Sequence, residues 1–181
     1  SGMQVRSGKL LRPLLHLTRE HLERYCQLQN IAYCYDSSND DLHYTRNKIR
    51  KELLPYLESN YNPSIKKALV RSAEILQEDD ACLNQMAQEK FQALAKHTEA
   101  GVILNVKKWQ ELPAALRKRI LRQAYFLAGG KELSYIHTEA LDVLCLRKTS
   151  GKYLQLPQKM IGFYKRGSLT IGLNKTIVLL P

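Results

Sequence analysis

Apolar side chains recur at steps of three, four and seven positions through the middle of the chain, a spacing that is typical of an amphipathic helix. The longest series follows the start signal Asn62-Pro63 and is expected to end at Gly101. The positions that share its apolar face are Ile65, Leu69, Ala73, Leu76, Leu83, Met86, Ala87 and Leu94. The pattern therefore predicts one long helix across residues 63–100.

Capping residues predict three shorter helices. Thr18 stands where its side chain can cap a helix, and Ser134 can do the same for a helix expected to end near Gly151. Pro113 is expected in the first turn of a helix that Gly129-Gly130 closes. All three helices follow polar or turn-forming sequence, as helix starts usually do.

Alternating apolar positions predict strands at two places. One lies directly after Gly101, and the other spans residues 152–173, with turn sequences at 156–158 and 165–168. Residues 10–15 and 31–35 are expected to be extended. The predicted fold is mainly α, with a helical segment, a long connecting helix and a small α+β domain that contains an antiparallel β-hairpin. The expected segments are 1–62, 63–100 and 101–181.

The charge is distributed unevenly along these segments. The chain carries 28 Lys and Arg against 17 Asp and Glu, a formal net charge of +11. Residues 101–181 hold fourteen basic and four acidic side chains, so this segment carries almost all of the excess. Positive charge concentrated in one segment favours an anionic partner.

Several classes of protein are disfavoured by the same composition. No apolar run approaches the length of a transmembrane helix, so no membrane partner is expected. The four cysteines lack the spacing of a metal site and suit the reduced state of a cytoplasmic protein. The five histidines form no ligand set either, and no metal ligand is predicted.

A further helix is expected to begin near Asp40 or Asp41 and to break or kink at Pro55. Arg46 and Arg50 fall inside its apolar arc, which comprises Leu42, Ile49, Leu53, Leu54 and Leu57. Arginines within a buried arc need an anionic partner, because an unpaired buried charge is costly. That partner is either a carboxylate of Asp36, Asp40 or Asp41, or a bound phosphate, and both interpretations can hold together.

The polar turn before this helix has a structural interpretation of its own. Asp36, Ser38 and Asn39 are the residue types that form Asx-turns and cap helices. For these three residues alone, a structural role is favoured over a functional one.

A second candidate site lies on the helix that follows Pro113. Lys118, Arg119 and Arg122 lie opposite its core stripe, interleaved with Tyr125 and Phe126. Cations suit an RNA backbone and flat rings suit unstacked bases. The alternative is a solvated basic face whose aromatic residues pack on a neighbouring element. The candidate surface also includes Lys165 and Arg166.

The polar cluster resembles the signature of the bacterial tRNA(Ile)-lysidine synthase family. The resemblance rests on Asp36-x-Ser38-Asn39 followed by Tyr44-x-Arg46-Asn47-x-x-Arg50. Supporting similarity extends over most of the chain, at residues 11–15, 62–63, 71–73, 151–157 and 163–166. The resemblance implies that Arg46, Asn47 and Arg50 lie near the ATP or target-base pocket, supported by Asp36, Ser38, Asn39 and Tyr44. It assigns them no individual roles.

The resemblance also implies a reaction. In this family of PP-loop ATPases, ATP with Mg²⁺ adenylates the C2 carbonyl of the wobble cytidine in the CAU anticodon of an isoleucine tRNA. The amine of free L-lysine then displaces AMP, which gives lysidine. The implied partners are that tRNA and lysine, in the cytoplasm, and a homodimer is left open.

One departure qualifies the resemblance. The family's ATP site opens with a Ser-Gly-Gly-x-Asp-Ser loop, and this sequence contains none. We therefore expect the chain to be the C-terminal portion of a longer enzyme, inactive alone, with residues 1–62 from the end of the ATP-binding domain and 101–181 as the tRNA-binding domain. The alternatives are a non-catalytic helical RNA-binding module and a helical protein-interaction domain.

Overall fold

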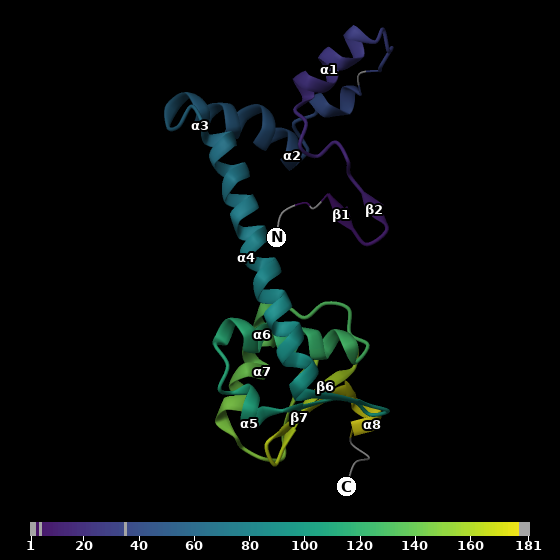
Figure 1. Cartoon of the computed structure of the whole chain (residues 1–181), viewed down its shortest axis with the longest axis vertical. Coiled ribbons are helices and arrows are strands. Elements are labelled where there is room, and N and C mark those ends of the chain that lie inside the picture. Colours follow the sequence, from purple (N-terminus) through teal and green to yellow (C-terminus); the bar gives the residue numbers. More distant parts are fainter. Residues whose placement is uncertain (1–2, 4, 35, 178–181) are drawn as a thin grey trace. The chain divides into compact units, whose positions relative to one another are not determined.

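The computed structural model describes residue 3 and residues 5–34 and 36–177. It contains two compact units, residues 1–78 and residues 79–181, and the division between them falls within helix α4 (Ile65–Leu94) (Figure 1). The functional boundaries predicted after residues 62 and 100 stay predictions.

The first unit consists of short elements. A small antiparallel ladder is followed by one regular helix and then by a series of short helical turns. Thr18 caps the first helix as predicted, because its Oγ1 accepts a hydrogen bond from the His21 amide at 3.3 Å. The elements are β1 (Arg6–Ser7), β2 (Leu10–Leu11), α1 (Arg19–Leu28), η1 (Ser37–Asp40), α2 (Thr45–Lys48), η2 (Ile49–Leu53) and α3 (Leu54–Asn60).

Two predictions for this unit need correction. The helix expected to start near Asp40 starts at Thr45, because the Asp41 carboxylate accepts the His43 amide at 2.9 Å and closes a local turn instead. The extended segment predicted for residues 10–15 is a strand only at Leu10–Leu11. Described residues 31–34 form no strand, and Tyr35 lies outside the described residues.

The predicted break at Pro55 takes a specific form. Pro55 lies in the first turn of α3, and the five residues before that helix form the π-helical turn η2. Proline lacks an amide hydrogen and its ring crowds the preceding turn, so the wider π-helical geometry accommodates it without ending the helix.

The second unit is built on a five-stranded antiparallel sheet. Its strand order is β3-β4-β7-β6-β5, with the hairpins predicted at the end of the chain in β5, β6 and β7. The bounds are β3 (Ala95–Thr98), β4 (Gly101–Asn105), β5 (Lys152–Leu156), β6 (Met160–Lys165) and β7 (Ser168–Leu173). The prediction of a mainly helical protein with a small antiparallel domain is confirmed.

Strand β3 was predicted as the last turn of the long helix, and that prediction is wrong. The helix α4 ends at Leu94, and Ala95–Thr98 pairs with β4 across a turn at residues 99–100, directly before Gly101. Gly101 has a φ of 128°, and a Cβ at this position would collide with the Ile171 carbonyl. Glycine therefore permits the close approach of this turn to β7.

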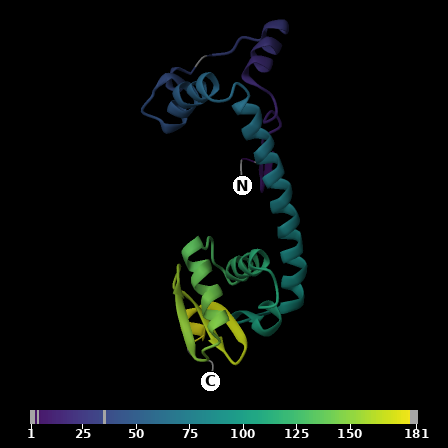
Figure 2. The same ribbon diagram turned by 90° about the vertical axis from the view of Figure 1, so that its left-hand side faces the viewer.

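Helices cover one face of the sheet. Figure 2 shows the green helices α6 and α7 against the yellow strands, and both helices contact the sheet. Ser134 caps α7 as predicted, whereas Pro113 is the N-cap of α6 rather than part of its first turn. The helices of this part are α5 (Val106–Trp109), α6 (Ala114–Leu127), α7 (Tyr135–Arg147) and α8 (Asn174–Ile177).

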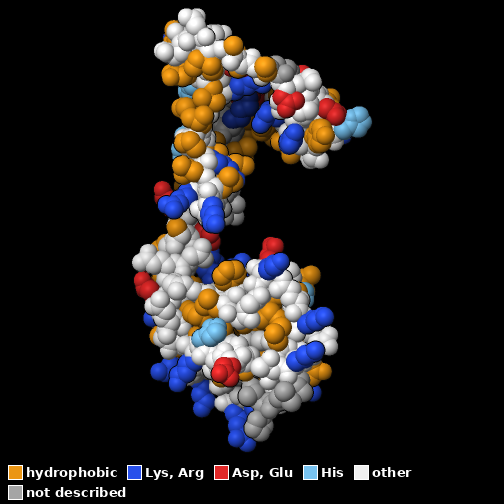
Figure 3. All heavy atoms as spheres, turned by 90° about the vertical axis from the view of Figure 1, so that its right-hand side faces the viewer, with side chains coloured by type: hydrophobic (Ala, Val, Ile, Leu, Met, Phe, Trp, Pro, Cys, Tyr) orange, Lys and Arg blue, Asp and Glu red, His pale blue; other side chains and the backbone are white. Residues whose placement is uncertain are grey.

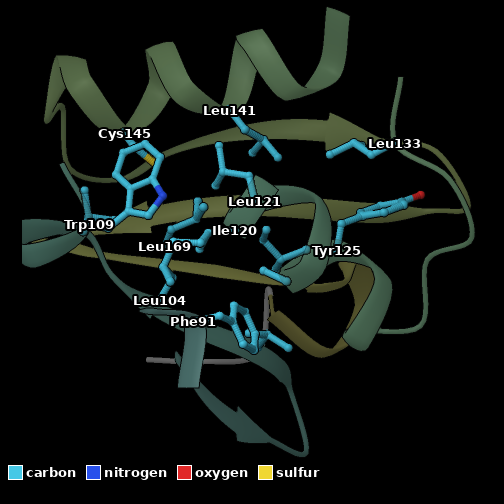
Figure 4. Close-up of a cluster of buried hydrophobic side chains, with 14 of the residues drawn as sticks. Phe91, Leu104, Trp109, Ile120, Leu121, Tyr125, Leu133, Leu141, Cys145 and Leu169 are labelled. Carbon is cyan, nitrogen blue, oxygen red and sulfur yellow. The ribbon is translucent and has the colours of Figure 1, made fainter. Parts of the chain in front are cut away.

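The core of the second unit lies between this helical layer and the sheet. Leu104, Trp109, Ile120, Leu121 and Leu141 are fully buried there (Figure 4). Burial of such side chains is the main favourable term in folding. Leu116, Ile120 and Ala124 of α6 are buried in this core, whereas Leu127 at the end of the helix is exposed.

Several polar side chains inside this unit are paired with one another or with the backbone. The Arg117 guanidinium donates two hydrogen bonds of 3.0 Å to the Asp142 carboxylate, and the pKa of Arg117 is raised chiefly by this hydrogen bonding. The indole of Trp109 donates to the Arg117 carbonyl at 3.2 Å. Cys145 is a buried residue of α7, and burial raises the pKa of its thiol to about 12. That thiol is therefore a packing group.

Candidate functional site

The polar turn of the first unit is held together by its own side chains. The Asp36 carboxylate accepts the Ser38 amide at 3.0 Å, and the Asn39 side chain donates to the Asp36 carbonyl at 3.0 Å. The pKa of Asp36 is lowered, first by hydrogen bonding from Ser38 and to a smaller extent by the positive charge of Arg46. The structural interpretation of Asp36 and Asn39 as turn-forming residues is confirmed.

Asn47 connects this turn to the helix that carries the two arginines. Its side-chain amide donates to the Ser38 carbonyl at 3.0 Å and to the Asp41 carbonyl at 2.7 Å. The residue is only 1% exposed, and no other described residue of the first unit is buried. Its geometry shows a positioning role, because both bonds satisfy backbone groups of the turn.

Arg46 and Arg50 are exposed, so the expectation that they lie within a buried apolar arc is wrong. Two side chains of that arc, Ile49 and Leu53, are 43% and 48% exposed. The Arg46 guanidinium lies over the Tyr44 ring, 5.0 Å from its centroid. A guanidinium stacked on a ring keeps its donors in a fixed plane, which suits bidentate contact with an anion.

The carboxylates proposed as partners for these arginines have other contacts. Asp40 forms an ion pair with Lys51, and Asp41 bonds to the ring of His43 at 2.8 Å. Asp36 influences Arg46 only through their electrostatic attraction. The arrangement leaves the exposed guanidinium groups oriented for solvent or for a ligand.

A pocket of about 340 Å³ lies beside the turn. Helix α1 forms one side with Arg19 and Glu23, which are paired at 2.5 Å, and the turn contributes Asp36 and Asn39. The remaining lining residues are Leu22, Cys26, Tyr33 and Cys34. The pocket therefore presents both charges next to the polar turn.

The candidate RNA surface on α6 is partly neutralised. Lys118 forms an ion pair with Glu139 of α7 and lies 5.7 Å from the centroid of the Tyr135 ring. Hydrogen bonding within this pair raises the pKa of Lys118 and lowers that of Glu139. Arg119 pairs at 2.5 Å with Asp80 of α4. These two cations have acidic partners that the sequence pattern did not reveal.

Arg122 and Arg166 are the exposed cations among the predicted RNA-binding residues, whereas Lys165 is half-buried. Arg166 lies in the turn between β6 and β7, where its backbone has a φ of 49° and its amide donates to Ser150 at 3.1 Å. Figure 3 shows Lys and Arg side chains distributed over the second unit with few acidic ones beside them.

Tyr125 does not belong to this surface. Its ring is 1% exposed, and its hydroxyl donates to the Pro157 carbonyl at 3.1 Å. A base cannot stack on a ring enclosed on both faces, so the RNA-binding role predicted for Tyr125 is wrong. Burial also raises the pKa of this hydroxyl.

Among the residues that the structure describes, no three His, Cys, Asp or Glu side chains are grouped closely enough to hold a metal ion. None of the described helices is both long and apolar enough to cross a membrane.

Two family models match the chain. The PP-loop domain matches residues 1–57, which include the polar turn, and the TilS substrate binding domain matches residues 104–167, which include α6. A tRNA(Ile)-lysidine synthase of Geobacter sulfurreducens is 37% identical over 157 residues. The chain belongs to the tRNA(Ile)-lysidine synthase family. The tRNA(Ile)-lysidine synthases of Leifsonia xyli and Clostridium acetobutylicum are 39% and 30% identical over 144 and 172 residues.

The matches cover most of this chain and a smaller part of each relative. They cover 85%, 79% and 94% of the chain in the order given, but 33%, 43% and 37% of the relatives. The chain therefore spans about two fifths of the length of these lysidine synthases or less. The two matched regions fall within the predicted segments 1–62 and 101–181.

Proposed function

We propose that this chain is part of an enzyme that joins lysine to C2 of the wobble cytidine of tRNA(Ile) with a CAU anticodon, at the expense of ATP. Residues 101–181 bind the tRNA, and the Asp36 turn with Arg46 and Arg50 forms one edge of the active site. The observation that carries the proposal is the match of both a PP-loop domain and a lysidine synthase substrate-binding domain within one chain.

The tRNA-binding role is supported by charge and exposure together. The matched region 104–167 lies in the segment that holds fourteen basic and four acidic side chains. Arg122 and Arg166 are exposed there, so their guanidinium groups can reach phosphates without first breaking an ion pair. Lys118 and Arg119 are weaker candidates, because binding would compete with Glu139 and Asp80.

The active-site role is supported by the geometry of the turn. Arg46 and Arg50 are exposed cations on a helix that Asn47 fixes to the turn, and they fit the charge of a phosphate group. ATP with Mg²⁺ supplies the adenylation of the C2 oxygen, which makes that oxygen a leaving group. Within this chain, the residues that fit the nucleotide are the two arginines, with Asn47 and Asp36 as positioning residues. The described residues offer no carboxylate cluster for Mg²⁺.

Free lysine is the second substrate in this proposal, and its amine displaces AMP from the activated cytidine. The cytoplasm, where tRNA and free lysine occur together, is the proposed compartment. A monomer and a homodimer are both compatible with the proposal.

The proposal is tested by comparing two tRNAs that share the CAU anticodon, tRNA(Ile) and tRNA(Met), for binding to the 181-residue chain at matched salt. We expect tighter binding of tRNA(Ile) and a linear fall of log K with log salt. Arg122→Gln should weaken binding and reduce the slope of log K against log salt by about 1, the value expected for the loss of one phosphate contact. Lys90→Gln, an exposed change on α4 outside the matched region, is the control and should leave the slope unchanged.

Equal affinity for the two tRNAs would favour a non-catalytic RNA-binding module over lysidine synthesis. Equal affinity for tRNA and heparin would show that only the net charge is being measured.

A further inference from the structure

The sheet of the second unit has a second face, opposite to α6 and α7. Gly162 marks the helix-covered face, because a Cβ at this position would meet Leu141 of α7 at 2.5 Å. Neighbouring residues on a strand point to opposite faces, so Phe163 lies on the other one. The pairing register places Tyr153 opposite Phe163 on the adjacent edge strand β5.

Only part of this second face is covered by described residues. Helix α8 contacts β6 and β7 (Figure 1). Ile161 of β6 and Ile177 of α8 are buried, although neither belongs to the core cluster under the helices. Beyond α8, Tyr153 is 60% exposed and Phe163 is half-buried. Directly opposite residues of an antiparallel pair have Cβ atoms about 4.5–5.5 Å apart, so the two rings are neighbours.

The charged residues of the sheet that carries these rings have one sign. The five strands β3 to β7 contain no Asp or Glu, and their charged residues are Lys96, Lys152 and Lys165. Lys165 follows Phe163 by two positions on β6 and therefore shares its face. Lys96 lies on the same face, because the cross-strand row continues from Phe163 through Thr170 and Ile103 to Lys96.

We propose that Tyr153 and Phe163 form a stacking platform for an unpaired nucleotide of RNA, with Lys165 beside them to attract the phosphate. The proposal rests on the tRNA-binding function proposed above and adds the site and the class of nucleotide. An aromatic ring stacks on any unpaired base, and lysine neutralises the backbone. A base inside a duplex exposes no face to such a platform, so the site discriminates between single-stranded and double-stranded RNA.

The experiment uses the 181-residue chain and a short single-stranded RNA that carries 2-aminopurine, whose fluorescence falls when it stacks. A blunt duplex of the same sequence is the comparison. We expect fluorescence quenching and binding with the single strand, and a roughly tenfold loss of its affinity in Tyr153→Ala, because the base loses the ring on which it stacks. Tyr153→Phe should retain both signals because it keeps the ring.

Two further variants separate stacking from folding. Phe163→Leu keeps an apolar side chain at the half-buried position but removes the ring, and it should also reduce quenching. Tyr25→Ala removes a tyrosine that is 58% exposed in the first unit and should change nothing. Circular dichroism of each variant confirms that the sheet is retained.

Unchanged quenching and affinity in both Tyr153→Ala and Phe163→Leu would overturn the platform. If tRNA(Ile) still bound more tightly than tRNA(Met) in that case, the proposed function would stand without it. A change in self-association of Tyr153→Ala with unchanged RNA binding would also overturn the platform, because it would assign this face to a protein contact. Failure of the unsubstituted chain to bind either tRNA would instead contradict the proposed function.

Discussion

The two units of this chain are stabilised by different interactions. Among the described residues, every buried hydrophobic side chain lies between Ala87 and Ile177, in the second unit. The described part of the first unit has one buried residue, the polar Asn47. Burial of apolar surface therefore determines the second unit, whereas local hydrogen bonds and caps determine the described geometry of the first.

This difference decides how a substitution in each unit should be interpreted. In the second unit, a change at a buried position alters the free energy of unfolding first, and any loss of RNA binding can follow from it. In the first unit, Arg46 and Arg50 are exposed, so their removal affects ligand contact with little cost to folding. The predictions below test this division, beginning with the largest expected effect.

Removal of the Asp142 carboxylate should cause the largest loss of stability. Asp142→Ala leaves the Arg117 guanidinium, whose side chain is 15% exposed, without its forked partner, and breaking such a pair costs about 3–5 kcal/mol. Urea unfolding monitored by the fluorescence of Trp109, the single tryptophan, measures the change because Trp109 lies 5.4 Å from Arg117.

The matched control is Glu23→Ala in the first unit, whose unfolding is followed by far-ultraviolet circular dichroism because Trp109 lies in the second unit. It removes the carboxylate of an exposed i,i+4 pair with Arg19, for which about 0.5 kcal/mol or less is expected. Similar losses in the two variants would show that burial does not distinguish the units.

Truncation of a leucine should separate the units almost as strongly. Leu121→Ala, at a fully buried position of α6, should lower the free energy of unfolding by about 2–5 kcal/mol, because it removes apolar contacts and leaves a cavity. Leu53→Ala, at a position 48% exposed in the first unit, should change it by about 0.5 kcal/mol or less. A loss above 2 kcal/mol for Leu53→Ala would show that this leucine makes an apolar contact. It would contradict the conclusion that apolar burial stabilises only the second unit.

Local features of the fold could be predicted from the sequence. Thr18 and Ser134 each place an oxygen next to the unpaired amides of a helix start, and both cap helices. The strands of the last hairpins were also predictable, because alternation and turn residues occur within short windows. The polar turn belongs to the same class, since the partners of Asp36 are two and three residues away.

Features that depend on distant partners could not be predicted. Ala95–Thr98 precedes the glycine that was expected to end α4, and it becomes a strand because β4 pairs with it. Tyr125 was placed among the RNA-binding residues because it is interleaved with the basic residues of α6. That helix contacts both α7 and the sheet, so the buried arc of α6 is wider than its apolar stripe and includes Tyr125. The exposure of Arg46 was missed for the opposite reason, because Leu42, Ile49 and Leu53 of the apolar arc beside it are themselves exposed.

Loss of the Asn47 side chain should disturb the first unit and leave the second intact. Asn47→Ala leaves the carbonyls of Ser38 and Asp41 without these donors, at a cost of about 1–3 kcal/mol in the local stability of the turn. Amide exchange of the turn residues should accelerate. The urea midpoint of the unfolding transition that Trp109 fluorescence reports should stay the same. Asn60→Ala is the control, because it removes an exposed bond to Tyr56. A shift of the Trp109 transition by Asn47→Ala would show that the units are coupled.

The smallest effect concerns pH and tests the link between the turn and Arg46. Hydrogen bonds from Ser38 and from His43 lower the pKa of Asp36 and of Asp41 below the ordinary value of 3.8. A carboxylate whose pKa is lowered on folding stabilises the turn above that ordinary value, and the stabilisation is lost as pH falls through the lowered pKa. Carboxyl NMR titration should therefore give both midpoints below 3.8.

Arg46→Gln then separates the two carboxylates. Arg46 is the weakest of the influences that lower the Asp36 pKa and is absent from those that act on Asp41, so the variant should raise the first midpoint slightly and leave the second unchanged. Equal shifts at both positions would indicate a general loosening of the turn. An unchanged Asp36 midpoint would mean that Arg46 lies too far away to act on it, and the arginine would then be presented to a ligand by Asn47 and Tyr44 alone.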